Sequence, residues 1–139
     1  MWPFNEHFEK QSPTTTMTDP VFGSIQYEYN VWATVPALES HGFRTVIVAS
    51  EAGPSEQQQT FYRSISGRLP EIETLAKKFI SNDPKKCIES KGLSIIAIYV
   101  GDNTQVQRAW LGVELTSEKG GDRHLVEFAQ GIPFSYMYF

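Results

Sequence analysis

The sequence predicts an α+β domain: a mostly antiparallel sheet of about six strands, with one long, kinked or broken helix packed on one face. Two observations carry this prediction. Between Glu51 and Asn82 the apolar residues are separated by three or four positions, the spacing of an amphipathic helix: Phe61, Ile65, Leu69, Ile72, Ala76 and Phe79. The segments on both sides have the patterns of strands. The predicted order is therefore β-β-β-α-β-β-β, and the helix is the element that covers the sheet.

Three strands are predicted before the helix. Residues Val21–Tyr29 alternate between polar and apolar side chains, and a second run, Val31–Val35, follows directly after Asn30. A tight hairpin at Asn30 is consistent with this spacing, although one asparagine is a thin turn signal. Residues Phe43–Ser50 form a strongly β-branched third run. These three strands are predicted to form an antiparallel meander.

The ends of the predicted helix carry start and stop signals. Ser55 is a suitable N-cap, and Gln58, three residues later, completes the spacing of a capping box. Pro70 interrupts the pattern, and a proline inside a continuous helix costs about 3 kcal/mol. Because the apolar phase continues across Gly67 and Pro70, we predict a kink or very short break that keeps one face on the sheet. The stop is the Asn-Asp-Pro sequence that begins at Asn82.

Three further strands are predicted after the helix. Leu93–Val100 is almost entirely apolar, which is typical of a central strand buried on both faces. Residues 109–116 alternate and predict a strand with one face in water. His124–Ala129 is the last predicted strand; residues 130–133 are predicted to form a turn and Phe134–Phe139 a short aromatic ending.

Length and composition indicate one domain. The chain has 139 residues, 40% of them hydrophobic, and we divide it into an N-terminal tail, residues 1–19, and a single domain, residues 20–139. The net charge of −4 argues against a surface for duplex nucleic acid, which needs clustered Lys and Arg. Neither a signal peptide nor a membrane-spanning run is recognisable, and Cys87 is the lone cysteine. These features predict a cytoplasmic protein with a reduced thiol.

No catalytic, cofactor-binding or metal-binding constellation stands out. The histidines lie apart, in a tail, a turn and a strand start: His7, His41 and His124. The grouping of Asp122, His124 and Glu127 is more simply a solvated hairpin. Asp102 and Glu114 are expected near one end of the sheet, but such carboxylate pairs are common by chance. We therefore predict that the protein is not an enzyme and uses no cofactor.

Aromatic and acidic residues form the strongest candidates for a partner-binding surface. Trp and Tyr are frequent anchors of protein interfaces, and acidic loops complement a basic partner. The tyrosines Tyr27, Tyr29, Tyr136 and Tyr138 are expected on the face away from the helix. The alternative is that the tryptophans belong to the core and the acids are solvated. The candidate partner-binding residues are Trp32, Glu51, Glu56, Asp102, Trp110, Glu118 and Asp122.

Two stretches of the chain resemble a small bacterial domain of unknown function. One runs from Val21 to Tyr27 and is followed by Trp32 and the Phe43–Ser50 strand; that domain opens with Asp-x-x-Phe-Gly and has a Trp-bearing second strand. The other begins Gly-Pro-Ser-Glu-Gln-Gln at Gly53, similar to the helix start Gly-Pro-Ser-Glu-x-Gln. The resemblance covers roughly residues 19–139, with Trp110 and the C-terminal strands fitting it loosely.

Such domains occur among immunity-like proteins of polymorphic or contact-delivered toxin systems. The resemblance therefore implies an immunity protein that binds a cognate toxin domain stoichiometrically and blocks its active site. It implies no catalytic residues. Two alternatives stay open: a small ligand-binding or enzymatic domain with a polar site at Asp102 or Glu114, and a structural adaptor that pairs through an exposed strand edge. A homo-oligomer is compatible with the sequence but not indicated by it.

Overall fold

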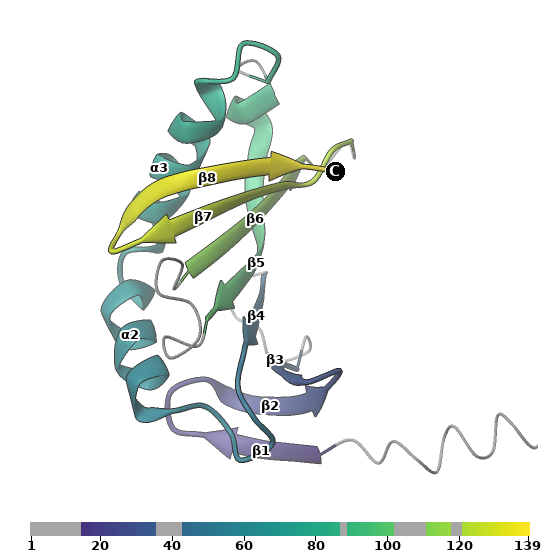
Figure 1. The fold of residues 1–139 in the computed structure, drawn as a ribbon, viewed down its shortest axis with the longest axis vertical. Coiled ribbons are helices and arrows are strands. Elements are labelled where there is room, and N and C mark those ends of the chain that lie inside the picture. Colours follow the sequence, from purple (N-terminus) through teal and green to yellow (C-terminus); the bar gives the residue numbers. More distant parts are fainter. Residues whose placement is uncertain (1–14, 36–42, 87–88, 102–110, 118–120) are drawn as a thin grey trace, which may run out of the picture.

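The computed structural model describes residues 15–35, 43–86, 89–101, 111–117 and 121–139, which form one eight-stranded sheet with both α-helices on one face (Figure 1). This confirms the predicted α+β class and its mostly antiparallel sheet. The strands are β1 (Thr15–Asp19), β2 (Gly23–Glu28), β3 (Val31–Thr34), β4 (Arg44–Ile47), β5 (Leu93–Val100), β6 (Leu111–Ser117), β7 (His124–Ala129) and β8 (Ile132–Tyr138). The helices are α2 (Glu56–Ser66), α3 (Leu69–Ser81) and the short 3-10 helix η2 (Glu89–Gly92).

The strands lie in the sheet in the order in which they occur in the chain. Each neighbouring pair is antiparallel except β4 and β5, which are parallel. A parallel pair needs a long crossover connection, and α2 and α3 provide it. The fold therefore consists of two four-stranded meanders, β1–β4 and β5–β8, joined edge to edge by the helical crossover.

The sequence predicts six strands, and the structure has two more in its described part. Residues 15–19, predicted as the end of a tail, form β1 and pair with β2 from Thr15 opposite Tyr27 to Asp19 opposite Gly23. At the other end, the hairpin turn contains only Gln130 and Gly131, which both have positive φ angles of 52° and 80°. A two-residue turn of this kind matches the twist of the flanking strands. The predicted short ending is therefore a seven-residue strand, β8.

The predicted helix is broken into two helices. At the end of α2 the amide of Arg68 donates to the carbonyl of Ile65 at 2.8 Å, which tightens the last turn. Pro70 lies at the start of α3, where its missing N–H costs no intrahelical hydrogen bond. The predicted capping box is confirmed: Ser55 Oγ accepts from the Gln58 amide at 3.1 Å, and Gln58 Oε1 accepts from the Ser55 amide at 3.0 Å.

The core lies between the helices and the face of the sheet that they cover. The predicted helix positions Ile65, Leu69, Ile72 and Ala76 are buried, and Phe61 and Phe79 are half-buried against the core. On the sheet, the core includes buried residues from every strand from β2 to β7: Ile25, Trp32, Ile47, Ile98, Val113, Val126 and Phe128.

Gln58 closes the core where the two parallel strands end. Its side chain is 2% exposed, and Nε2 donates to the carbonyls of Val48 at 2.8 Å and Gly101 at 3.1 Å, each just beyond β4 or β5. A buried carbonyl without a partner is costly, so this amide stabilises the join between the two meanders. One side chain thus caps the helix and links both halves of the sheet.

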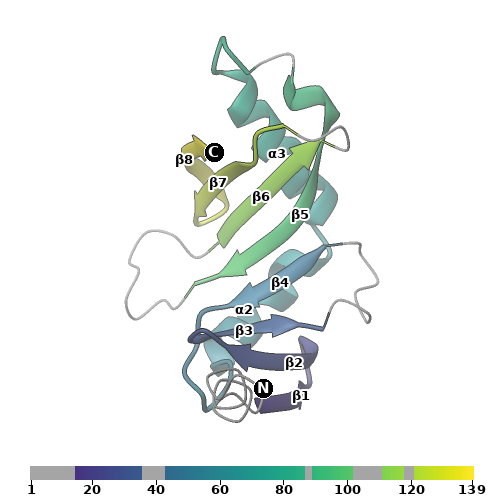
Figure 2. The same cartoon turned by 90° about the vertical axis from the view of Figure 1, so that its right-hand side faces the viewer.

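The other face of the sheet carries no helix of the described residues (Figure 2). Three cross-strand pairs lie on this face: Tyr99–Gly112, Glu114–Leu125 and Leu125–Met137. Side chains alternate along a strand, and the residues next to these in sequence point into the core. The prediction that Leu93–Val100 is buried on both faces is therefore wrong in one respect. The strand is central, but Tyr99 is only half-buried.

Candidate functional site

The edge strand β8 carries most of the exposed apolar side chains. Five of the seven exposed large hydrophobic residues in the described ranges belong to β8 and the residue that follows it. They are Ile132, 67% exposed, Phe134, 40%, Met137, 50%, Tyr138, 43%, and Phe139, 61%. We call these five residues the β8 edge. Single exposed apolar residues are ordinary, but five of them on one edge strand and its end indicate an interaction surface.

The β8 edge lacks the charges that usually protect an edge strand. The segment from Gln130 to Phe139 contains no Asp, Glu, Lys or Arg. Proteins block edge pairing with charged side chains, bulges or proline, and here Pro133 protects the first part of the strand. The Arg123 amide donates to the Phe139 carbonyl at 2.9 Å and the Phe139 amide to the Arg123 carbonyl at 3.0 Å. By the antiparallel alternation, the backbone N–H and C=O of Tyr138 then point away from β7.

Contacts on the helix-covered side hold β8 in place. His124 is 1% exposed, and its Nδ1 lies 2.9 Å from the Tyr136 hydroxyl, with the two rings stacked. Lys86 Nζ lies 4.4 Å from the centre of the Tyr138 ring and 2.5 Å from Asp122 Oδ2. The hydrogen bond from Lys86 lowers the pKa of Asp122 below its usual range. These contacts fix β8 on the helix-covered side, while Ile132, Phe134, Met137 and Phe139 stay exposed.

A buried ion pair lies on the uncovered face beside β8. Glu114 is 2% exposed; its Oε1 accepts from the Tyr99 hydroxyl at 2.6 Å, and its Oε2 accepts from Arg123 Nε at 2.5 Å. The Arg123 side chain is 53% exposed, and its guanidinium lies 5.4 Å from the centre of the Phe139 ring. Both carboxylate oxygens therefore have partners. The arrangement stabilises the end of the sheet and presents no group placed for proton transfer to a substrate.

The Tyr99 hydroxyl leads to a testable prediction about how the free energy of unfolding depends on pH. Burial raises the pKa of Tyr99 to about 12, and the hydrogen bond to Glu114 adds to this effect. Because the pKa is higher in the folded than in the unfolded chain, the contribution to stability is complete below pH 10.0 and is lost as the pH rises through about 12. We expect the free energy of unfolding to fall more steeply above pH 10.0 in the parent protein than in Tyr99→Phe. Urea unfolding at several alkaline pH values measures this difference.

Tyr29→Phe is the control for this experiment, because Tyr29 is 82% exposed. It should follow the parent protein at every pH. If Tyr99→Phe also follows the parent, the hydroxyl contributes nothing to the alkaline dependence.

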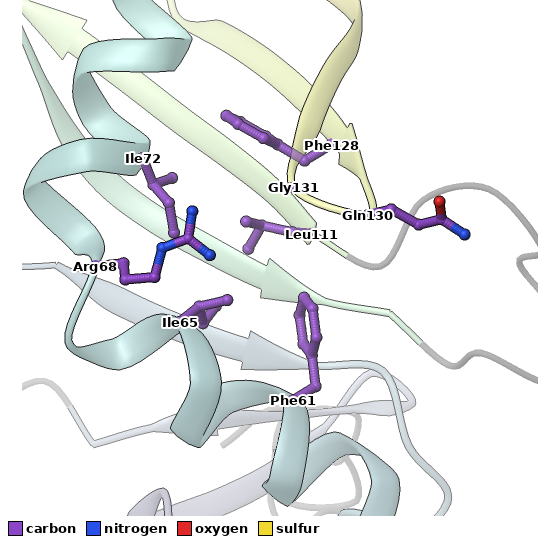
Figure 3. A pocket seen from close by; sticks show the side chains of 8 residues that line it. All are labelled: Phe61, Ile65, Arg68, Ile72, Leu111, Phe128, Gln130 and Gly131. Carbon is purple, nitrogen blue, oxygen red and sulfur yellow. The ribbon is translucent and has the colours of Figure 1, made fainter.

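An apolar hollow lies between the helix break and the turn that connects β7 to β8 (Figure 3). It is small, with a cavity volume of about 20 Å³, which is room for about one water molecule. Its apolar walls come from both helices and from β6 and β7: Phe61, Ile65, Ile72, Leu111 and Phe128. At the rim, Gln130 points away and Arg68 is paired with Glu71, Nε to Oε2 at 3.0 Å. None of the described residues that line it is a carboxylate, histidine or cysteine, so this part of the chain places no acid–base group in the hollow.

The structure separates the candidate residues predicted from the sequence. Trp32 is 1% exposed in the core, as in the alternative that the tryptophans are core residues. Glu51 and Glu56 are exposed around the start of α2, at the β1 end of the sheet, where Gly53 approaches Met17. Asp122 precedes β7 at the opposite end and is paired with Lys86. The other three candidates, Asp102, Trp110 and Glu118, lie outside the described residues.

The structure also differs from two other expected groupings of side chains. His124 and Glu127 are on opposite faces of β7, so the grouping of Asp122, His124 and Glu127 does not form one site. Among the residues described, no three His, Cys, Asp or Glu side chains are close enough to hold a metal ion. Three of the four tyrosines expected on the uncovered face lie on the covered one, opposite buried residues: Tyr27, Tyr136 and Tyr138.

The β8 edge itself is not among the predicted candidates. The signal that could have found it is the charge-free run of apolar and aromatic residues from Ile132 to Phe139. Reading residues 130–133 as a turn shortens this run and conceals a full strand. Only the sheet order shows that β8 is an outer strand of the sheet that the described residues form.

No protein-family model, curated protein or solved structure matches the chain. None of the helices in the described ranges is both long and apolar enough to cross a membrane.

Proposed function

We propose that this protein acts by binding another protein and that the β8 edge is the contact strand. The observation that carries the proposal is the uncharged edge strand with five exposed apolar side chains. An extended segment of a partner adds to such an edge through main-chain hydrogen bonds, and alternate side chains supply specificity.

The partner in this proposal is the cognate toxin domain that the sequence resemblance implies, and the protein is its stoichiometric inhibitor. The net charge of −4 favours association with a basic toxin surface, and the exposed Glu51 and Glu56 contribute to that charge. The alternative of a small enzyme gains no support from Glu114, because both of its carboxylate oxygens are paired.

The test is binding between the purified chain and the toxin domain encoded by the neighbouring gene. Met137→Lys places a charge on the β8 edge at a half-exposed position and should weaken binding at least tenfold, or about 1.4 kcal/mol. Co-expression of this variant should also rescue growth less well than co-expression of the parent. Isothermal titration calorimetry measures the first effect, and growth of the co-expressing cells measures the second.

The matched control is Thr18→Lys, which adds the same charge to the opposite edge strand at an exposed position. It should bind as the parent does. Equal binding by the parent and Met137→Lys would rule out β8 as the contact strand. Failure of the parent chain to bind or to protect would overturn the toxin assignment.

A further inference from the structure

In the single chain, nothing in the described structure covers the outer side of β8. An exposed apolar edge that can form hydrogen bonds is a template for association with any other strand. We infer that, before a foreign partner binds, the β8 edge pairs antiparallel with β8 of a second copy of this chain. The product is a two-fold symmetric dimer with one continuous sheet. This inference concerns the same strand as the proposed function but does not require the toxin.

The absence of charged residues on the β8 edge allows a second copy to be the occupant. The chain carries a net charge of −4, so two copies repel each other over most of their surfaces. The segment Gln130–Phe139 has no Asp, Glu, Lys or Arg, and two copies of it meet without placing like charges opposite each other. Interfaces between identical subunits are also richer in apolar residues than other interfaces, which matches the composition of the β8 edge.

Backbone geometry limits where the pairing occurs. Pro133 has no N–H to donate, so the first part of the strand is a poor template. Further along, the backbone groups of Tyr138 point away from β7, as the Arg123–Phe139 hydrogen-bonded pair requires. Phe134 lies at an irregularity of the β7–β8 ladder, between Pro133 opposite Phe128 and Ser135 opposite Glu127, so the pairing segment is Ser135–Phe139. Two identical antiparallel strands satisfy a two-fold axis, because each residue pair across the axis occurs twice.

The opposite edge of the sheet explains why the assembly stops at two copies. The other outer strand of the described sheet is β1, whose sequence Thr-Thr-Met-Thr-Asp is polar. Pairing of β8 with β1 of another copy would be heterologous and would extend into an open-ended filament. Pairing of β8 with β8 uses both apolar edges at once and leaves two polar β1 strands outside.

The experiment is sedimentation equilibrium of the purified full chain from about 1 to about 200 μM, with no other protein present. We expect a reversible monomer–dimer equilibrium. Met137→Lys places a cation on each of the two facing strands and should raise the dimer dissociation constant at least tenfold. Thr18→Lys should leave that constant unchanged. Hydrogen exchange should show the Tyr138 amide slowing in the parent as the concentration rises, and no such change in Met137→Lys.

Three results would overturn the inference: a monomer across the whole range, a dimer that Met137→Lys does not weaken, or a dimer in which exchange at Tyr138 does not slow. The outcome is independent of the toxin assay. If the protein is a monomer and its β8 variants lose toxin binding, the dimer inference is refuted. The proposed contact strand then still holds. If the dimer depends on β8 but its monomeric variants bind the toxin normally, β8 is not the toxin contact strand. The dimer inference then still holds.

Discussion

Trp32→Ala is expected to lower the free energy of unfolding by about 4 kcal/mol, the range of large aromatic truncations in well-packed cores. Trp32 is 1% exposed, and its indole Nε1 donates to the carbonyl of Ser50 at 2.7 Å. Its ring lies 5.2 Å from that of Tyr27, centre to centre. Truncation removes this packing and leaves the Ser50 carbonyl without its indole donor. Urea unfolding followed by circular dichroism at neutral pH measures the change.

Two further variants separate packing from hydrogen bonding. Trp32→Phe keeps a ring but loses the donor to Ser50, and should cost about 1 to 2 kcal/mol beyond the small loss of volume. Tyr29→Ala, at a residue 82% exposed, should change stability by no more than about 0.5 kcal/mol. If Trp32→Ala weakened toxin binding while leaving stability intact, Trp32 would be a contact residue and not part of the core.

The prediction of the fold from sequence succeeds where local chemistry determines local structure. The capping box at Ser55 and Gln58, the break at Gly67 and Pro70, and the apolar strand Leu93–Val100 all follow from neighbouring residues. The failure to predict the full β8 strand has a different cause. The turn at Gln130-Gly131 uses left-handed backbone conformations that only the glycine signals, so the sequence does not distinguish a two-residue hairpin from a longer turn.

The parallel pairing of β4 and β5 depends on information that the strands themselves do not carry. Either strand could pair with several others on the basis of its apolar pattern. Their direction is set by the two helices between them, which return the chain to the same end of the sheet. Gln58 then bonds to carbonyls beyond both strands, a long-range contact that the capping pattern does not reveal.

The candidate site is less predictable than the fold because exposure depends on the sheet as a whole. Trp32 and Tyr138 both lie in strands with mixed patterns, yet one is buried and the other is 43% exposed. The difference comes from position: β3 is inside the sheet and β8 is at its edge. Asp122 looks like a free loop acid in the sequence, but Lys86, far away in the chain, neutralises it. Sequence composition alone cannot rank these residues.

Arg123→Met is the second variant with a large expected effect. Glu114 is 2% exposed, and Arg123 is its cationic partner, so the substitution leaves a buried carboxylate whose charge is uncompensated. Removing one member of a buried ion pair costs about 3 to 5 kcal/mol, and we expect about 3 because the Arg123 side chain is 53% exposed. Methionine keeps most of the aliphatic stem, so the loss reports the charge rather than the packing. Urea unfolding at neutral pH measures it.

A double-mutant cycle with Glu114→Gln shows whether the two side chains act as a pair. Glu114→Gln alone should cost less than Arg123→Met, because the half-exposed guanidinium regains water while the Tyr99 hydroxyl still has an oxygen to donate to. Adding Glu114→Gln to Arg123→Met should then recover part of the lost stability, since no buried charge remains. The expected coupling is about 1 to 3 kcal/mol. Additive losses would mean that Arg123 stabilises the sheet through its contact with Phe139 and not through Glu114.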